Sequence, residues 1–106
     1  MATKFDLATM AALIERQRKV WVTLSTEYLD GSGSIYLQRR ELDGWYRVYV
    51  QYDYTNHTVF ASPSLKCVVA EANRWLAKPA SEVTWTTIKV ARDATRDRCN
   101  AIGVSV

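Results

Sequence analysis

Cysteine and histidine are scarce in this chain of 106 residues, which contains two cysteines and one histidine. Cys67 and Cys99 are too few for the disulfide framework that holds small secreted domains together. Together with His57 they also fall short of a structural zinc site, and their spacing matches no zinc finger. Because no signal peptide is evident at the N-terminus, we expect a cytoplasmic protein. Since no metal-binding motif is present, we also expect no metal or other cofactor.

Glycine, proline and long apolar runs are scarce as well. With four glycines and two prolines, the chain has no linker or low-complexity tract, and we expect one domain over residues 1–106. No apolar run approaches the ~20 residues that a membrane-spanning helix needs. The chain is 48% hydrophobic and 24% charged, which is typical of a globular fold with one core. Its net charge of +3 permits a nucleic-acid partner but does not demand one.

Residues 20–54 alternate between apolar and polar side chains in three runs, a pattern typical of β-strands. Residues 30–33, Asp-Gly-Ser-Gly, separate the first two runs, and Asp43-Gly44 separates the second and third. Asp-Gly supplies the left-handed conformations that tight hairpin turns need. The region therefore predicts an antiparallel β-meander.

Two segments have apolar residues at helical spacing. Residues 6–18 predict a first helix with Asp6 as its N-cap. Ser62 and Pro63 predict the start of a second helix, with Ser62 as N-cap and Pro63 as first helical residue. Proline is suited to this position because the N–H that it lacks would have no partner within the helix. Pro79 ends that helix shortly after Ala77.

The remaining segments complete an α+β fold with the order α-β-β-β-α-β. Residues 53–56 resemble a turn, residues 58–61 fit a short edge strand, and residues 92–99 fit a short helix. Residues 82–90 are rich in Val, Thr, Trp and Ile, which favours a further strand. We expect an antiparallel sheet of three to five strands with two helices packed on its aliphatic face. The expected core residues are Leu7, Met10, Ile14, Val22, Leu24, Ile35, Leu37, Val48, Val50, Leu65, Val69, Ala72 and Leu76.

The opposite face of this sheet is expected to carry aromatic and arginine side chains, because side chains alternate strictly along a strand. These residues are Trp21, Tyr36, Arg40, Trp45, Arg47 and Tyr49. Base stacking on such rings is worth ~1–3 kcal/mol per base, and an arginine between rings adds a phosphate or cation–π contact. The same residue types dominate protein interfaces. The face therefore predicts a binding surface for single-stranded nucleic acid or for a protein.

Two other interpretations explain this face without a ligand. The chain from Arg92 onward would bury the rings if it folded across them, and cross-strand aromatic pairs stabilise a sheet by themselves. Arg92, Arg96 and Arg98 form a basic cluster, and we include Arg96 and Arg98 in the predicted surface because grouped arginines bind phosphates. Their neighbours Asp93 and Asp97 also fit an ordinary solvated surface.

No arrangement of residues predicts an enzyme. His57 has no carboxylate at a spacing that indicates a catalytic pair, and the carboxylates are scattered along the chain. Residues 31–33, Gly-Ser-Gly, lead into a strand rather than into a helix N-terminus, so they form no phosphate-binding loop. We therefore expect a non-enzymatic protein.

The order of helix, three-strand meander and helix over residues 6–77 is similar to that of double-stranded-RNA-binding domains. That family opens its second helix with a lysine cluster, whereas residues 62–66 here read Ser-Pro-Ser-Leu-Lys, and its Gly-Pro-x-His signature is absent. The likeness is one of topology alone.

In size and style the chain resembles the small phage-encoded inhibitors of bacterial defence, in particular the anti-CRISPR proteins. These are compact, cytoplasmic, usually non-enzymatic and rich in exposed aromatic and charged residues, and they share no common motif. The resemblance implies a partner that is a nucleoprotein defence complex or the nucleic acid that it exposes. The alternative is a protein–protein inhibitor or a dimeric module without nucleic-acid contact, although we expect a monomer rather than a homodimer.

Overall fold

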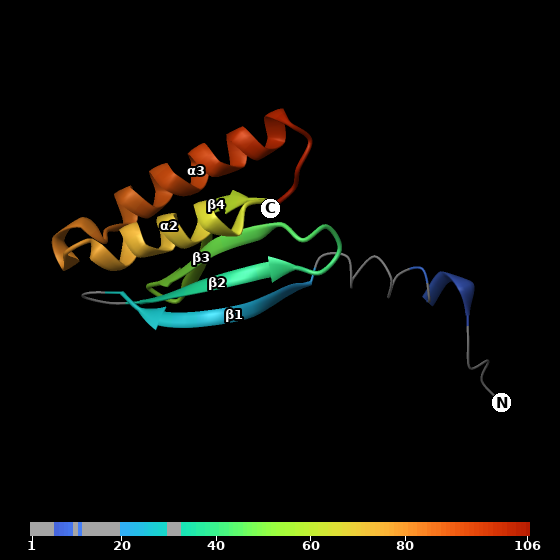
Figure 1. The fold of residues 1–106 in the computed structure, drawn as a ribbon, viewed down its shortest axis with the longest axis horizontal. Coiled ribbons are helices and arrows are strands. Elements are labelled where there is room, and N and C mark those ends of the chain that lie inside the picture. The colour runs from blue at the N-terminus through green and yellow to red at the C-terminus, as the bar shows by residue number, and fades with distance from the viewer. Residues whose placement is uncertain (1–5, 10, 12–19, 30–32) are drawn as a thin grey trace.

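The structure is a computed structural model that describes residues 6–9, 11, 20–29 and 33–106. Four strands form one antiparallel sheet whose spatial order follows the chain (Figure 1). They are β1 (Trp21–Tyr28), β2 (Ser34–Arg40), β3 (Tyr46–Tyr52) and β4 (Thr55–Ser62). Helix α2 (Leu65–Ala77) follows, then the short 3-10 helix η1 (Ala80–Glu82) and helix α3 (Trp85–Ala101). The predicted α+β class and the antiparallel sheet are confirmed.

The turns pair the strands as their sequences predict. Gly44, with φ 70°, lies in the turn between β2 and β3. Between β3 and β4, Asp53 and Tyr54 have φ values of 48° and 62°, the positive pair that a tight hairpin requires. At the β1–β2 connection, the Leu29 N–H donates to the Gly33 carbonyl at 3.1 Å. The strand predicted at residues 58–61 lies within the longer β4, which begins at Thr55, so residues 55 and 56 belong to a strand and not to the predicted turn.

A bulge in β1 reverses the orientation of its second half. Thr23 lies opposite Gln38, but Ser25 lies opposite Leu37, so Leu24 is the extra residue. An extra residue changes which face the following side chains occupy. Ser25 therefore faces the same way as Leu37, and not the way that strict alternation predicts.

The aliphatic face of the sheet, here called the inner face, carries the core. Ile35 on β2 and Val48 and Val50 on β3 are buried, as predicted. Val59 on β4 belongs to the same buried cluster. The prediction was wrong for Val22 and Leu24, which are 40% and 52% exposed. Both belong to β1, an edge strand of the sheet, and Leu24 is the extra residue of the bulge.

Helix α2 lies across β2, β3 and β4. Its buried residues are Val68 and Trp75, whereas Leu65 and Val69, which we expected in the core, are 45% and 39% exposed. Ala72 and Leu76 pack against the core as expected.

The N-termini of the helices are capped by short polar side chains. For α2 the N-cap is Ser64, whose hydroxyl accepts from the Cys67 N–H at 3.3 Å, and not the predicted Ser62. The Ser62 hydroxyl instead accepts from the Ser64 N–H. Asp6 accepts from the Thr9 N–H at 3.2 Å, as an N-cap does. Most of the predicted helix over residues 6–18, including Met10 and Ile14, lies outside the described residues, and Leu7 is 89% exposed.

Residues 82–90 do not form the predicted strand, because α3 begins at Trp85 and includes residues 92–99. Thr84 is its N-cap, and Ile88, Thr95 and Cys99 are its buried residues. Burial of this helical face outweighs the strand propensity of the individual residues. The ion pairs from Arg92 and Arg96 to Asp93 offset the like-charge repulsion along the helix.

Helix α3 runs alongside β4 and covers this edge of the sheet (Figure 1). The Thr95 hydroxyl donates to the Val59 carbonyl at 2.8 Å. Arg98 donates from Nη2 to the Ala61 carbonyl at 2.9 Å. These bonds satisfy carbonyl groups of an edge strand that would otherwise be open to another strand.

Candidate functional site

The guanidinium of Arg47 lies at the centre of the sheet face opposite α2, here called the outer face. Its Cζ is 4.2 Å from the centre of the Trp21 indole and 3.9 Å from the centre of the Tyr49 ring. Trp21 comes from β1, before the bulge, and Arg47 and Tyr49 come from alternate positions of β3. Each cation–π contact is worth ~0.5–2 kcal/mol, depending on how much water is excluded.

The hydrogen-bond acceptors of Arg47 are neutral. Its Nε donates to Gln38 Oε1 at 2.7 Å, and its Nη1 donates to Thr58 Oγ1 at 3.3 Å. Gln38 is held in turn by donating from Nε2 to Thr23 Oγ1. Within the part of the chain that the structure describes, no carboxylate forms an ion pair with Arg47. Burial lowers the pKa of Arg47 from 12.5 to about 10, a value at which it is still cationic near neutral pH.

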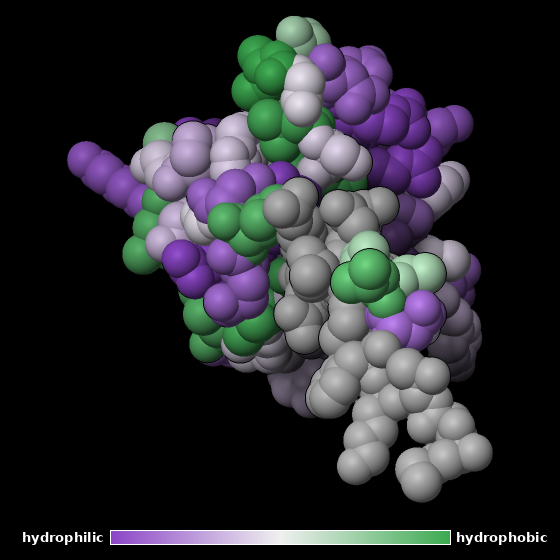
Figure 2. Space-filling model, turned by 90° about the vertical axis from the view of Figure 1, so that its right-hand side faces the viewer, coloured by the Kyte–Doolittle hydropathy of each residue, from purple (hydrophilic) through white to green (hydrophobic). Residues whose placement is uncertain are grey.

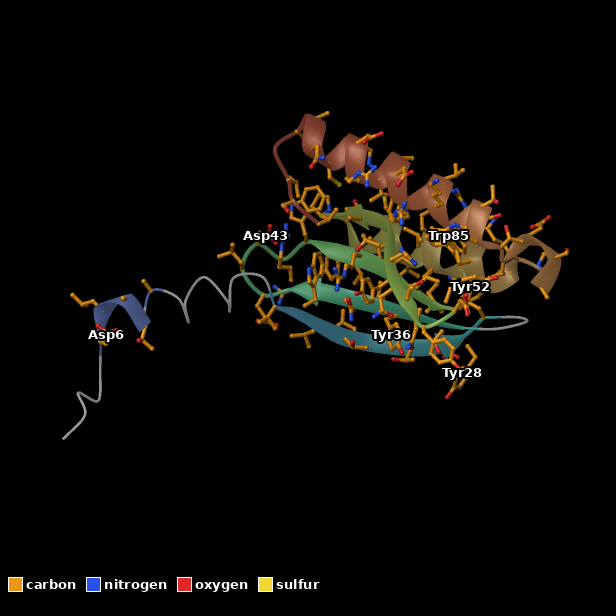
Figure 3. The ribbon with its side chains drawn as sticks, turned by 180° about the vertical axis from the view of Figure 1, so that it is seen from behind. Asp6, Tyr28, Tyr36, Asp43, Tyr52 and Trp85 are labelled. Carbon is orange, nitrogen blue, oxygen red and sulfur yellow. The ribbon has the colours of Figure 1, made fainter. Side chains whose placement is uncertain are left out.

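Arg40 belongs to a different arrangement on the same face. It donates from Nε and Nη2 to the two carboxylate oxygens of Asp43 at 3.0 and 2.8 Å, and from Nη1 to the Ser105 carbonyl. Its hydrogen bond holds the pKa of Asp43 below its ordinary value. Figure 3 shows Asp43 at one end of the sheet. Arg40, at 4.9 Å from the Trp21 ring centre, therefore fixes the hairpin to the C-terminal residues and supports Trp21.

A polar hollow of about 320 Å³ opens between the outer face and α3. We call it the arginine hollow. The residues that line it are Arg47, Tyr49, Asn56, His57, Thr58, Arg92, Arg96 and Val106. Figure 2 views the molecule end-on, and a continuous hydrophilic area lies at its upper right, toward the side seen in Figure 3.

A second hollow of about 270 Å³ adjoins it over the middle of the sheet. We call it the tyrosine hollow, and its lining residues are Thr23, Tyr36, Gln38, Tyr49, Gln51 and Asn56. The Tyr36 and Tyr49 rings are 6.5 Å apart and tilted by 57°. Tyr36 donates from its hydroxyl to Gln51 Oε1 at 3.0 Å. Tyr49 and Asn56 line both hollows, so the two form one continuous site.

His57 is buried and is one of the residues that line the arginine hollow. Its Nε2 is 2.7 Å from the Thr55 hydroxyl, and its ring centre is 5.0 Å from that of Trp85. Burial, followed by the charge of Arg92, lowers the pKa of His57. Trp85 lies next to Tyr52 (Figure 3), and both line a further small hollow. His57 thus has neutral neighbours and a cation, an environment that favours its uncharged form.

The structure brings together most of the residues that the sequence singles out. Trp21, Arg47 and Tyr49 are in direct contact, with Tyr36 beside Tyr49, and Arg96 reaches the site from α3. Trp45 lies at the β2–β3 turn, where its carbonyl accepts from the Arg40 N–H. Arg98 packs 4.8 Å from the Phe60 ring centre and bonds to β4, so it lies outside both hollows.

Eight residues that line the two hollows were not predicted as part of the site: Thr23, Gln38, Gln51, Asn56, His57, Thr58, Arg92 and Val106. Asn56, His57 and Thr58 come from β4, and the hairpin turn at Asp53 and Tyr54 was the available signal for their position. Arg92 and Arg96 are four residues apart, which places both on one side of a helix. The helix predicted over residues 92–99 contains both residues, so this signal was already present in the sequence.

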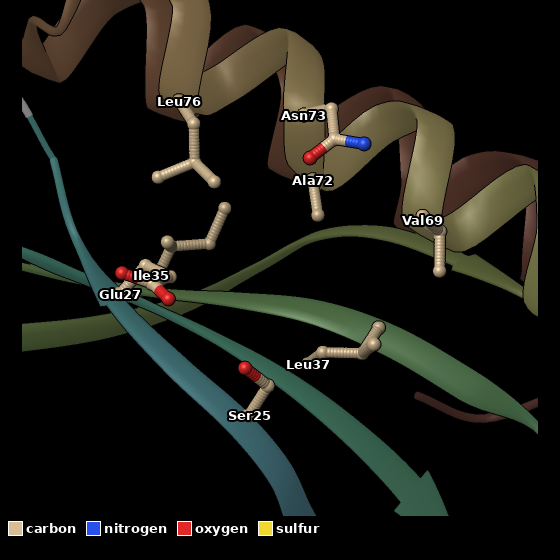
Figure 4. Close-up of a pocket in the computed structure, with 8 residues that line it drawn as sticks. All are labelled: Ser25, Glu27, Ile35, Leu37, Val69, Ala72, Asn73 and Leu76. Atoms are coloured by element: carbon tan, nitrogen blue, oxygen red, sulfur yellow. The ribbon is translucent and has the colours of Figure 1, made fainter.

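A separate apolar groove lies between the inner face and α2 (Figure 4). It has a volume of about 260 Å³ and is lined by Ser25, Glu27, Ile35, Leu37, Val69, Ala72, Asn73 and Leu76. Figure 4 shows side chains of α2 and of the strands pointing toward each other across it. The groove borders the exposed strand β1.

Two chemical features are absent from the described residues. No cluster of histidine, cysteine, aspartate and glutamate is suited to hold a metal ion there. In the same residues, no helix has both the length and the apolar character needed to cross a bilayer. No protein-family model matches the chain, and no match was found among curated proteins or solved structures.

Proposed function

We propose that this protein is a non-enzymatic binding protein whose outer face holds single-stranded nucleic acid, free or within a nucleoprotein complex. The observation that carries the proposal is Arg47, a half-buried guanidinium held between two rings and bonded to neutral acceptors. The neighbours that bond to Arg47 carry no negative charge. A phosphate would provide that charge and would bind through charge-assisted hydrogen bonds.

The neighbouring tyrosines favour a single strand over a duplex. Tyr36 and Tyr49 present rings on an open sheet face, and Gln51 and Asn56 add amide groups beside them. Unpaired bases can stack on such rings and hydrogen-bond to amides, whereas bases inside a duplex have neither surface free. Two stacked bases at ~1–3 kcal/mol each, together with phosphate contacts, support binding in roughly the micromolar range.

The resemblance to anti-CRISPR proteins assigns no residue to this face. If that resemblance extends to function, the bound strand is one that a bacterial defence complex holds. The proposal itself depends only on the arrangement of Trp21, Arg47 and the two tyrosines.

Quenching of tryptophan fluorescence by single-stranded oligonucleotides tests the proposal, because Trp21 lies at the site. Arg47→Gln should weaken binding by about tenfold or more, since it removes a phosphate contact and a stacked cation. For three neutralised phosphates, the logarithm of affinity should fall with the logarithm of salt concentration with a slope of about −2. Arg47→Lys should recover only part of the affinity, because lysine keeps the charge but not the planar fork.

Arg74→Gln is the matched control, since it removes the same charge from the exposed surface of α2, away from both hollows. It should leave affinity within about twofold of the parent protein. Equal weakening by Arg47→Gln and Arg74→Gln would show that net charge alone drives binding. Absence of quenching at low salt, with oligonucleotides of several lengths, would refute the proposal.

A protein partner docked against β1 is the second candidate. Residues 22–28 of this strand are all exposed, and among the described elements only β2 pairs with it. Val22, Leu24 and Tyr28 expose large apolar side chains. An extended segment of a partner could add to this edge through main-chain hydrogen bonds.

Leu24→Lys separates this candidate from nucleic-acid binding. The side chain is 52% exposed, so the variant should fold normally, while a charge on the strand should block edge pairing. Recovery of the same partner by parent protein and Leu24→Lys after nuclease treatment would exclude the β1 edge. Loss of oligonucleotide binding in Leu24→Lys would contradict the assignment of the strand to the outer face.

A further inference from the structure

Three guanidinium groups from two elements of the fold converge on the arginine hollow. Arg47 comes from β3, and Arg92 and Arg96 come from one side of α3. None of the side chains that line the hollow is a carboxylate. Cations four residues apart on a helix repel each other, so a site that gathers three of them favours an anion.

Arg92 and Arg96 also have partners outside the hollow. Arg92 lies 5.3 Å from the centre of the Trp85 ring, and Arg96 Nε is 3.9 Å from Asp97 Oδ1. A single oxygen of Asp93, Oδ1, accepts from Arg92 Nε at 3.0 Å and from Arg96 Nη2 at 3.2 Å. These bonds and charges hold the pKa of Asp93 below its ordinary value. Each guanidinium has five N–H groups. The terminal nitrogens of Arg92 have no protein acceptor among the described residues, and can donate to a bound group.

The size and lining of the hollow suit an oxyanion. Its volume of about 320 Å³ is about ten times the ≈ 30 Å³ that one water molecule occupies in the liquid. The Asn56 amide and the Thr58 hydroxyl add neutral donors from β4. Phosphate oxygens accept several such bonds at once, and paired guanidinium forks match their geometry.

The adjoining tyrosine hollow indicates what carries the phosphate. Tyr49 and Asn56 border both hollows, so a group in one lies next to a group in the other. Because Gln51 uses its Oε1 to accept from Tyr36, its amide nitrogen remains as a donor. A planar, hydrogen-bonding group joined to a phosphate would fit this pair of sites, and a nucleotide has that chemistry.

We infer that the arginine hollow is a phosphate-binding subsite, in which Arg47, Arg92 and Arg96 hold the phosphate of a nucleotide whose base lies against Tyr36 and Tyr49. The inference rests on the proposed function and deepens it by assigning a position to one phosphate of the strand. The phosphate is either a terminal monoester or an internal diester, which share the same oxyanion chemistry.

Inorganic phosphate and thymidine monophosphate are the first probes, with unphosphorylated thymidine as the matched ligand, all at constant ionic strength. In NMR titrations, both phosphates should shift signals of Asn56, Thr58 and the His57 ring, with affinities near the millimolar range. Only the nucleotide should also shift the ring signals of Tyr36. The pKa of His57, which burial and Arg92 lower, should rise when the dianion binds.

Arg96→Gln is the decisive variant, because its side chain is 57% exposed and its loss should leave the fold intact. It should weaken phosphate binding by about fivefold or more, and Arg92→Gln should do the same. Lys89→Gln is the control, an exposed residue of the same helix outside the hollow. Equal affinities in Arg96→Gln and Lys89→Gln, or phosphate shifts located elsewhere, would overturn the inference.

The experiment separates this inference from the proposed function. If oligonucleotides bind but Arg92→Gln and Arg96→Gln leave their affinity unchanged, the subsite is wrong and the proposed function remains. If phosphate shifts the residues of the hollow but no oligonucleotide quenches Trp21, the subsite is correct and strand binding is wrong. An oligonucleotide with a terminal phosphate that binds tighter than its unphosphorylated form identifies the monoester, whereas equal affinities identify the internal diester.

Discussion

Replacing Arg47 with methionine should weaken the proposed nucleic-acid binding strongly, with a smaller effect on stability. The fall in its pKa from 12.5 to about 10 corresponds to about 3 kcal/mol of unfavourable burial. Solvent screening reduces this to roughly 1–2 kcal/mol for a half-buried side chain. The substitution removes this cost, which stabilises the protein. It also removes two cation–π contacts at ~0.5–2 kcal/mol each and two hydrogen bonds at ~0.5–1.5 kcal/mol each, which destabilises it.

Methionine restores part of the lost contact, because its sulfur packs against aromatic rings with ~0.3–1.5 kcal/mol. At the middle of each range, these contributions lower the free energy of unfolding of Arg47→Met by about 2 kcal/mol. Oligonucleotide affinity should drop by about tenfold or more, as for Arg47→Gln.

Urea denaturation, followed by circular dichroism, measures the first quantity, and an unchanged slope shows that the two-state transition is kept. Fluorescence quenching measures the second. A loss of ~4 kcal/mol, typical of truncation in a packed core, together with unchanged affinity would refute the reasoning. Arg47 would then be a structural residue that holds Trp21 and Tyr49 in place.

Three further predictions concern the fold. Val50→Asp should unfold the protein, as seen by loss of the circular dichroism signal, because it places a charge at a position that is 0% exposed. Thr95→Val should lower the free energy of unfolding in urea by ~1–3 kcal/mol, since it leaves the Val59 carbonyl without its donor; the exposed Thr86→Val should change it by less than ~0.5. The folded pKa of His57 lies below its ordinary value of 6.5, so its contribution to stability is present above about pH 6.5 and is lost as the pH falls through the folded pKa. His57→Gln should flatten this dependence between about pH 7 and 5, and an equally steep profile would show that other groups cause it.

The centre of the site could be predicted from sequence because it depends on local rules. The Asp43-Gly44 turn pairs β2 with β3, and strict alternation then places Tyr36 beside Tyr49 and Gln38 beside Arg47. Neither step requires knowledge of distant parts of the chain. The contacts of Arg47 follow from this register.

The orientation of β1 could not be predicted in the same way. Nothing in its sequence marks Leu24 as the residue of a bulge, since the run fits uninterrupted alternation. A single extra residue was enough to turn Ser25 and Glu27 toward the apolar groove. Bulges depend on how two strands pair, and the sequence of one strand does not contain that information.

The helix predicted over residues 92–99 lies within α3, but the first part of α3 was predicted wrongly, for a different reason. Thr, Trp, Ile and Val favour strands, and this preference predicts a strand over residues 82–90. The spacing of Ile88, Thr95 and Cys99 fits one helical face, and Thr84 supplies a suitable N-cap. Here the burial of a whole face, which extends beyond residue 90, outweighs the local propensity of the first few residues.

The position of α3 links the stability of the sheet to the proposed site. Thr95 and Arg98 bond to the open edge of β4, while Arg92 and Arg96 line the arginine hollow. The helix therefore protects a strand edge that could otherwise pair with other chains, and brings two of the three cations to the outer face. Displacing α3 would remove both features together. Arg96, which is exposed, can instead change without loss of the edge contacts, so the proposed phosphate subsite can be tested independently of the fold.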